Sequence, residues 1–251
     1  MKQLTALEPV KTWSLIVTLL GDMNEPQLSG KEMGYLLGHV GIKPEAIRVA
    51  IHRLKKDGWI STSKNGREVI YRLSTSGIAA TSAVYRDVYG TEVKYDTAWR
   101  LLLLESPDAI KEVGEQAIRL LKRVYLLPSS CVIKPNIALE FDIQNHVIPE
   151  WVVEQLVPAD VLVTARKLNT LAQTIIDDMP TGTTSKTLNA IDSATLRLMI
   201  LHRWRKMALR KNTWAHIGLF PDGPMAQCHR HLTRLLADLP RLDAQQFSSS
   251  H

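Results

Sequence analysis

The sequence predicts an α+β protein with a small N-terminal domain of helices and a hairpin, a middle domain of alternating strands and helices, and an α-helical C-terminal domain. Two observations favour this class. Apolar residues recur at helical spacing near both ends of the chain, whereas short apolar runs bounded by turn residues lie between them. In addition, two strand-like runs flank Asn65-Gly66, directly after a cationic helical segment.

Composition places the chain among folded proteins of a reducing compartment. Hydrophobic residues make up 45% of the 251 positions, and charged residues 22%, which is typical of a globular protein. No apolar run approaches the length of a membrane span, and the N-terminus lacks the apolar stretch of a secretory signal. The two cysteines, Cys131 and Cys228, offer no disulfide framework. We therefore expect a cytoplasmic protein with no membrane partner.

Positive charge is concentrated in one part of the chain. The formal net charge is +6, and residues 43–72 alone carry eight Lys and Arg against three Asp and Glu. A cationic cluster of this kind is the electrostatic signature of a surface that binds nucleic acid.

The N-terminal domain is predicted over residues 1–75 and begins with three helices. An amphipathic helix spans residues 10–20, and Ser29 followed by Glu32 has the form of a capping box that opens a second helix. Pro44 suits the first position of a third helix, which ends near Gly58. The third helix has a predicted buried stripe of Ile47, Ala50, Ile51 and Leu54.

The third helix and the hairpin after it predict a winged helix-turn-helix that binds DNA. Asn65-Gly66 predicts a type I′ turn between strands 59–63 and 68–73, and Trp59 is expected to anchor the hairpin to the core. Arg48 and His52 are candidates for base edges, whereas the other cations are candidates for phosphates. The predicted DNA-binding residues are Lys43, Arg48, His52, Arg53, Lys55, Lys56, Lys64 and Arg67. The alternative is that the helix merely presents a solvated face, with Arg48 paired to Glu45.

The rest of the chain is predicted as a linking helix, a middle domain and a C-terminal domain, at residues 76–92, 93–180 and 181–251. The middle domain is expected to hold strands at residues 98–104, 124–133 and 159–165 and a helix at residues 107–123. Helices are expected at residues 189–209 and 225–239, after a loop at residues 180–185.

Other chemistry-bearing residues were weighed against ordinary structural roles. Cys228, His229 and His231 lack the spacing of a zinc site, so no metal site is predicted. Arg203 and Arg205 are candidates for binding an anionic ligand, although a solvated helix face or a dimer contact would also explain them. No catalytic motif is present, and Asp96 is best interpreted as a turn or cap residue, so we expect neither an enzyme nor a cofactor.

Several segments resemble one family throughout the chain. SLIVTLLGDM (14–23), IRVAIHRLKKDGWI (47–60) and GREVIYRLSTSG (66–77) resemble the PaaX family of GntR-like winged-helix repressors of phenylacetic-acid degradation. The resemblance continues at residues 83–90, 99–105, 196–212 and 228–239.

The resemblance implies a homodimer on a palindromic operator, a ferredoxin-like (Cas2-like) middle domain, and phenylacetyl-CoA as the effector that releases the DNA. A regulator that responds to a different acyl-CoA or aromatic acid is an alternative. A nucleic-acid-processing enzyme that uses the middle domain and a dimeric module that binds protein are further alternatives.

Overall fold

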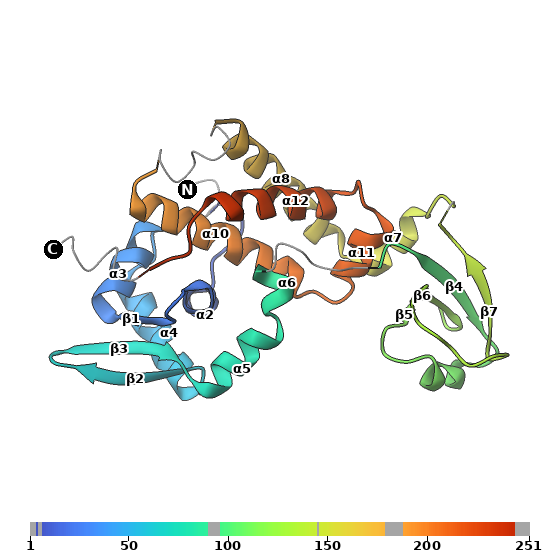
Figure 1. The fold of residues 1–251 in the computed structure, drawn as a ribbon, viewed down its shortest axis with the longest axis horizontal. Coiled ribbons are helices and arrows are strands. Elements are labelled where there is room, and N and C mark those ends of the chain that lie inside the picture. The colour runs from blue at the N-terminus through green and yellow to red at the C-terminus, as the bar shows by residue number, and fades with distance from the viewer. Residues whose placement is uncertain (1–3, 5–6, 90–95, 145, 179–187, 244–251) are drawn as a thin grey trace. The chain divides into compact units, whose positions relative to one another are not determined.

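The computed structural model describes residues 4, 7–89, 96–144, 146–178 and 188–243. Helices and antiparallel sheets both occur, which confirms the α+β class (Figure 1). The chain forms two compact units: the first contains Met1–Val93, Lys167–Leu209 and Cys228–His251, and the second contains Lys94–Arg166 and Arg210–Gln227.

The N-terminal part of the first unit contains both helices and strands. Their order is α2 (Thr12–Asp22), β1 (Gln27–Ser29), α3 (Gly30–His39), α4 (Pro44–Lys56), β2 (Ile60–Asn65) and β3 (Glu68–Leu73). The strands form an antiparallel sheet in the order β1-β3-β2, with Gln27 opposite Arg72 and Ile60 opposite Leu73. The three helices and the hairpin were predicted, but β1 was not, because its partners lie more than forty residues away in sequence.

The capping box predicted from Ser29 and Glu32 is confirmed. The Glu32 backbone N–H donates to Ser29 Oγ at 3.2 Å, and the Ser29 N–H donates to Glu32 Oε2 at 2.7 Å. Two N–H groups that lack partners inside the helix are thereby satisfied.

The segment after the hairpin forms two helices rather than one. α5 (Thr75–Ala83) and α6 (Tyr85–Tyr89) are separated at Val84, whose φ of −111° is not helical. Gly77 lets α5 approach the start of β2, because a Cβ there would lie 2.3 Å from the Trp59 carbonyl oxygen.

The described residues of the C-terminal half include the longer helices α8 (Ala159–Asp178), α10 (Ala190–Ala208) and α12 (Pro224–Asp238). The strand expected at residues 159–165 is wrong. Buried residues along this segment recur every three or four positions, as on a helix, and continue to Ile176. The predicted helices at residues 189–209 and 225–239 are confirmed by α10 and α12.

The second unit contains a four-stranded antiparallel sheet in the order β5-β6-β4-β7. Its strands are β4 (Trp99–Leu104), β5 (Ile118–Arg119), β6 (Val124–Pro128) and β7 (Ala138–Asp142), and its short helices are α7 (Glu150–Leu156) and α11 (Thr213–Leu219). One sheet face forms a core around Leu102, Leu104, Tyr125 and Leu127.

The helix expected at residues 107–123 is wrong, as is the extension of β6 beyond Pro128. A 3₁₀ helix, η1 (Pro107–Glu112), is followed by Gly114 with φ of +95°, a left-handed conformation that interrupts a right-handed helix. Pro128 ends β6 because it has no backbone N–H for the ladder, and residues 131–133 are not in a strand.

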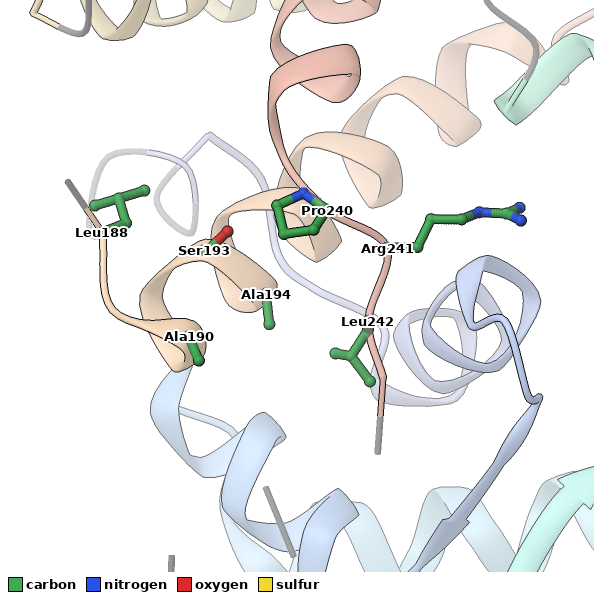
Figure 2. Close-up of a pocket in the computed structure, with 7 residues that line it drawn as sticks. All are labelled: Leu188, Ala190, Ser193, Ala194, Pro240, Arg241 and Leu242. Atoms are coloured by element: carbon green, nitrogen blue, oxygen red, sulfur yellow. The ribbon is translucent and has the colours of Figure 1, made fainter. Parts of the chain in front are cut away.

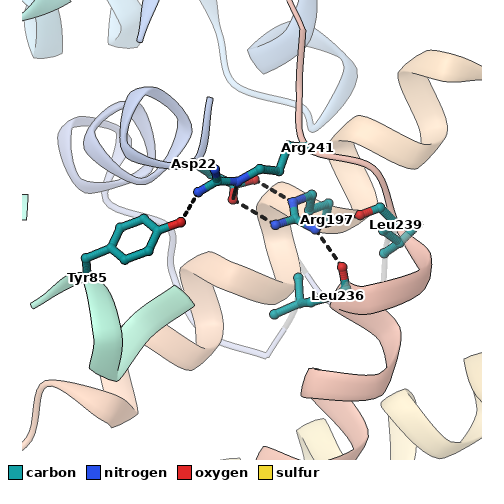
Figure 3. A network of polar contacts seen from close by, with 6 residues as sticks. All are labelled: Asp22, Tyr85, Arg197, Leu236, Leu239 and Arg241. Carbon is teal, nitrogen blue, oxygen red and sulfur yellow. Dashed lines mark hydrogen bonds and ion pairs between the residues drawn. The ribbon is translucent and has the colours of Figure 1, made fainter. Parts of the chain in front are cut away.

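Helix α10 lies inside the first unit and packs against α2, α3 and α6. It carries buried charged groups as well as apolar ones. The Arg197 guanidinium donates to the Asp22 carboxylate at 2.6 and 2.9 Å, and also to the backbone carbonyls of Leu236 and Leu239 (Figure 3). Arg241 approaches the same carboxylate at 3.8 Å. This network joins α2, α10 and the end of α12.

Further along α10, His202 and Arg203 are also buried. Burial, reinforced by the cations Arg203, Arg205 and Lys206, lowers the pKa of His202 to about 4, so the imidazole is neutral at pH 7. The Arg203 guanidinium donates to the Leu4 carbonyl at 2.8 and 3.0 Å and to the Glu8 carbonyl at 2.7 Å. Burial also lowers the pKa of Arg203. These bonds attach the start of the chain to α10.

No helix in the described part of the chain is both long enough and apolar enough to cross a membrane.

Replacing one partner of the buried ion pair should destabilise the protein strongly. In Arg197→Met, the Asp22 carboxylate loses its bidentate partner in a dry environment, which should lower the free energy of unfolding by about 3–5 kcal/mol in urea titrations. Lys111→Ala, which breaks the exposed Lys111–Asp108 pair, is the control and should cost at most about 1 kcal/mol. Equal losses in the two variants would contradict the role assigned to Arg197.

Stability should fall with acid because of His202. The unfolded chain takes up a proton near pH 6.5, whereas folded His202 does so only near pH 4. Below pH 6.5 the unfolded chain therefore binds a proton at this residue that the folded chain does not. The free energy of unfolding should fall by up to about 3 kcal/mol as the pH is lowered from 6.5 to 4. Urea titrations from pH 7 to pH 4 should show a smaller loss for His202→Asn than for the wild type. Parallel curves would mean that His202 does not titrate in this way.

Candidate nucleic-acid interface

Helix α4 exposes its charged side because its apolar stripe is buried. Pro44 occupies its first turn, where a missing N–H has no intrahelical partner to lose. The predicted stripe is buried at Ile47, Ala50 and Leu54, whereas Ile51 is only half-buried. Gly58, with φ of +73°, follows the helix and turns the chain into β2.

The opposite side of α4 is a cationic surface. Arg48, His52, Lys55 and Lys56 are all exposed at spacings of three or four residues. Val49 lies among them with 69% of its surface exposed, although it is apolar. We name Arg48, Val49, His52, Lys55 and Lys56 the α4 face. The sequence analysis missed Val49, whose signal is an apolar residue outside the buried stripe.

Arg48 has a partner in the structure. Its Nη2 donates to Glu45 Oε1 at 2.9 Å, one turn earlier on α4, and both side chains are more than 70% exposed. An exposed ion pair of this kind contributes little to stability, so Arg48 can exchange Glu45 for another hydrogen-bond acceptor.

Arg53 lies on the flank of α4 that meets α2. Its guanidinium carbon is 5.5 Å from the centre of the Trp13 ring, and its Nε is 3.5 Å from Asp57 Oδ2. A cation over an indole face is electrostatically attracted to the ring. Arg53 therefore links α4 to the start of α2, and the rest of its side chain remains largely exposed.

The tip of the β2–β3 hairpin also carries cations, but its turn differs from the prediction. Asn65 is paired with Glu68, so the two-residue loop is Gly66-Arg67 rather than Asn65-Gly66. Gly66 has φ of +60° and Arg67 does not have a positive φ, a pattern that matches a type II′ turn better than type I′. Arg67 is thus at the apex of the hairpin. Lys64 is one residue before the pair that closes the turn, and both cations are exposed.

Lys43, the N-cap residue of α4, is exposed as well. All eight predicted DNA-binding residues therefore belong to the first unit and reach solvent at α4 or at the hairpin tip. Trp59, predicted as a core anchor, is half-buried, and its carbonyl accepts a hydrogen bond from the Ser74 N–H at 2.9 Å.

A cavity of about 280 Å³ lies between the end of α10 and the segment that leads into α2. Arg203 and Arg205, the predicted ligand-binding residues, both line it, but they differ in their surroundings. Arg203 is buried and bonded to the Leu4 and Glu8 carbonyls, whereas Arg205 is half-buried and donates to Ser14 Oγ at 3.2 Å. The sequence analysis missed Lys11 and Trp13, which also line the cavity.

A second cavity, of about 210 Å³, lies beside the start of α10 (Figure 2). Ala190, Ala194 and Leu242 contribute to its walls, and Arg241 is its one charged residue among those described. Figure 2 shows the Arg241 side chain extending away from Ala190, and Arg241 is hydrogen-bonded to the Tyr85 hydroxyl. This cavity thus offers less charge to a ligand than the one beside Arg205.

The residues considered for metal binding or catalysis are buried or contact neighbouring protein groups. Cys228 is buried, which raises the pKa of its thiol to about 12, and His229 packs on the Trp204 ring at 5.1 Å. His231 Nδ1 lies 2.7 Å from Asn169 Oδ1, and Asp96 accepts a hydrogen bond from the Ser130 hydroxyl at 2.7 Å. Within the described ranges, no three His, Cys, Asp or Glu residues are grouped so that they could hold a metal ion.

Comparisons with known proteins agree with these features. Residues 11–77, from α2 to the start of α5, match the family model described as "PaaX-like protein". The transcriptional repressor PaaX of Escherichia coli (strain K12) is 33% identical over 116 residues, or 44% of this chain. The match spans little more than a third of that repressor, 37% of its length.

Among solved structures, the uncharacterized protein Rv0674 from Mycobacterium tuberculosis is 15% identical, and the match covers 88% of this chain and 94% of that one. Its TM-score of 0.39 is too low to establish a shared fold. The family match and the curated relative together agree with the resemblance seen in the sequence: residues 11–77 are similar to PaaX-like proteins.

Proposed function

We propose that this chain is a transcriptional repressor that binds operator DNA through a winged helix-turn-helix made of α2, β1, α3, α4 and the β2–β3 hairpin. One observation carries the proposal: the first unit exposes a row of cations on α4 and further cations at the tip of the adjoining hairpin. A helix of this width and charge fits the major groove, and a cationic hairpin tip can contact the flanking backbone.

In this proposal, some side chains of α4 contact bases and recognise the operator sequence, whereas others contact phosphates and position the helix on the DNA. Arg48 and His52 are one turn apart near the middle of α4 and contact base edges, where Arg is suited to guanine. Val49 contacts thymine methyl groups, because it offers an apolar surface beside those two polar ones. Phosphates are contacted by the remaining cations, which fix the register of α4 on the duplex: Lys43, Arg53, Lys55, Lys56, Lys64 and Arg67.

The wider biology of the proposal draws on the resemblance to the PaaX family. The relative's name supports a transcriptional repressor. The phenylacetate catabolic operon, the cytoplasmic location and release by phenylacetyl-CoA are what the resemblance implies, and they are part of the proposal. A homodimer would place two α4 helices on the two half-sites of a palindromic operator. Release by an effector is supported by the cations beside the 280 Å³ cavity, where part of an acyl-CoA or an aromatic acid could bind.

A ferredoxin-like middle domain is part of the proposal and is supported by strand order alone. The order β5-β6-β4-β7 places the first and third strands of the domain at the centre, as in a βαββαβ arrangement. The connections differ from that arrangement, since η1 follows β4 and residues 129–137 join β6 to β7 without a helix.

Substitutions on α4 and on the hairpin should weaken DNA binding in different ways. Arg48→Ala should cost about 1–3 kcal/mol for an operator fragment and much less for unrelated DNA, because a base contact is lost. Lys64→Ala should weaken binding to the operator fragment and to unrelated DNA to a similar extent. It should also reduce the slope of log K against log salt by about 0.9, since one phosphate contact is lost. Fluorescence anisotropy with DNA from upstream of the chain's own gene measures both effects.

Lys111→Ala, an exposed cation in the second unit, is the control for both variants and should leave affinity and salt slope unchanged. If Arg48→Ala and Lys64→Ala bind as the wild type does, the proposed interface is wrong.

Val49→Ser tests the apolar contact separately. It removes the methyl groups but keeps the charge and the exposure of α4, so the salt slope should stay constant while operator affinity falls by about 1 kcal/mol. Replacing thymine by uracil in the operator should remove most of the difference between Val49→Ser and the wild type. A difference that persists on the uracil operator would show that Val49 contacts something other than a thymine methyl.

A further inference from the structure

The cavity beside Arg205 combines positive charge with an aromatic wall. Lys11, Arg203, Arg205 and Lys206 line it, and no acidic residue is among the described residues that do so. The Glu8 carboxylate is paired with one of these cations, Lys206. One carboxylate beside four cations leaves this wall with net positive charge, which favours an anion in a partly desolvated site.

The rest of the wall is suited to a flat apolar group. Trp13 contributes an indole ring, and Leu209 and Pro9 contribute aliphatic surface. Ligand pockets in proteins are typically roughly 300–1,000 Å³, so a space of about 280 Å³ takes one aromatic ring with its anionic substituent rather than a whole coenzyme. Arg203 is held in place by the Leu4 and Glu8 carbonyls, so this part of the wall is already organised before a ligand arrives.

One wall residue also contacts the DNA-binding helix. The Trp13 ring lines the cavity, and the Arg53 guanidinium of α4 lies over the same ring at 5.5 Å. Trp13 is half-buried at the start of α2, and α2 packs against α4. A ligand that stacks on Trp13 or shifts it must therefore change the contact that holds Arg53.

We propose that this cavity is a regulatory site for a planar aromatic ring bearing an anionic group, and that its occupancy is transmitted to α4 through the Trp13–Arg53 contact. The inference rests on the proposed function, because it names the site that regulates DNA binding. In this proposal, the ligand and the operator both affect the Trp13–Arg53 contact. If the ligand weakens operator binding by a given factor, the operator weakens ligand binding by the same factor.

Two sources of this ligand chemistry can be separated by choice of probe. Phenylacetate supplies an aryl carboxylate, and free coenzyme A supplies a phosphorylated adenine nucleotide. Phenylacetyl-CoA contains the same phosphorylated nucleotide together with the phenyl ring. Phenylacetamide has the ring without the charge and serves as the control compound. Calorimetric titration of the full chain should detect binding of at least one anionic probe and no binding of phenylacetamide.

Substitutions then locate the site. Arg205→Ala should weaken binding of the anionic probe at least about tenfold, since a charge-assisted contact is lost, while operator affinity without probe stays within about twofold. Arg205→Lys should restore part of the binding. Lys211→Ala, an exposed cation that does not line the cavity, is the matched control and should bind the probe as the wild type does.

Arg53→Ala tests the transmission. It should lower operator affinity modestly and keep probe affinity within about threefold of the wild type. The factor by which the probe weakens operator binding should fall towards one, because the link from Trp13 to α4 is gone.

The outcomes separate the two proposals. If the wild type binds its operator but none of the three anionic probes, or if Arg205→Ala binds the probe as tightly as Lys211→Ala, the regulatory site is wrong and the DNA-binding proposal stands. If a probe binds in an Arg205-dependent way but no DNA upstream of the gene is bound, the repressor proposal is wrong. An Arg53→Ala variant that keeps the full release factor overturns the transmission route alone.

Discussion

The ion pair between Asp22 and Arg197 joins parts of the first unit that are 175 residues apart in sequence. Both side chains are almost completely buried, and Arg197 also donates to the carbonyls that end α12. A charge taken out of water is stable only if its partner is present with good geometry, so this pair tolerates few arrangements of α2, α10 and α12. The helices that bear the proposed DNA-binding surface are thus held by the C-terminal part of the chain.

Other side chains of α10 also hold N-terminal segments of the chain in place. Arg203 holds the Leu4 and Glu8 carbonyls, His39 of α3 contacts Asp192 at 2.7 Å, and Arg205 contacts Ser14. Each contact joins α10 to a segment within the first forty residues. Any movement of α10 relative to α2 therefore changes the support of α4, which would be a physical basis for the proposed coupling between a ligand beside α10 and DNA at α4.

Local signals predicted much of the first unit. The capping box at Ser29, Pro44 at the start of α4 and the paired strands of the hairpin depend on neighbouring residues, and the structure has all three. Long-range features could not be predicted. β1 is a strand only because β3 is beside it, and the role of Arg197 depends on Asp22. The domain boundaries remain predictions.

The errors have local causes that can be identified. The turn of the hairpin moved by one residue because Asn65 pairs with Glu68, and Gly66 alone has the positive φ. The expected helix at residues 107–123 contains Gly114 in a left-handed conformation, and the expected strand at residues 159–165 has helical periodicity that extends into α8. For the candidate site, the cations of α4 were predicted from sequence, but Val49, Lys11 and Trp13 acquire significance only from exposure or from a shared cavity.

The distance in sequence between Asp22 and Arg197 has a consequence for synthesis of the protein. Asp22 in α2 is synthesised 175 residues before its partner Arg197, an interval of roughly ten to thirty seconds at ordinary rates of translation. During that interval, the nascent chain carries an apolar helix and a carboxylate whose buried environment does not yet exist. The proposed DNA-binding surface therefore gains this support only after the C-terminal helices are translated, and a chain that terminates before Arg197 lacks the ion pair that holds α2.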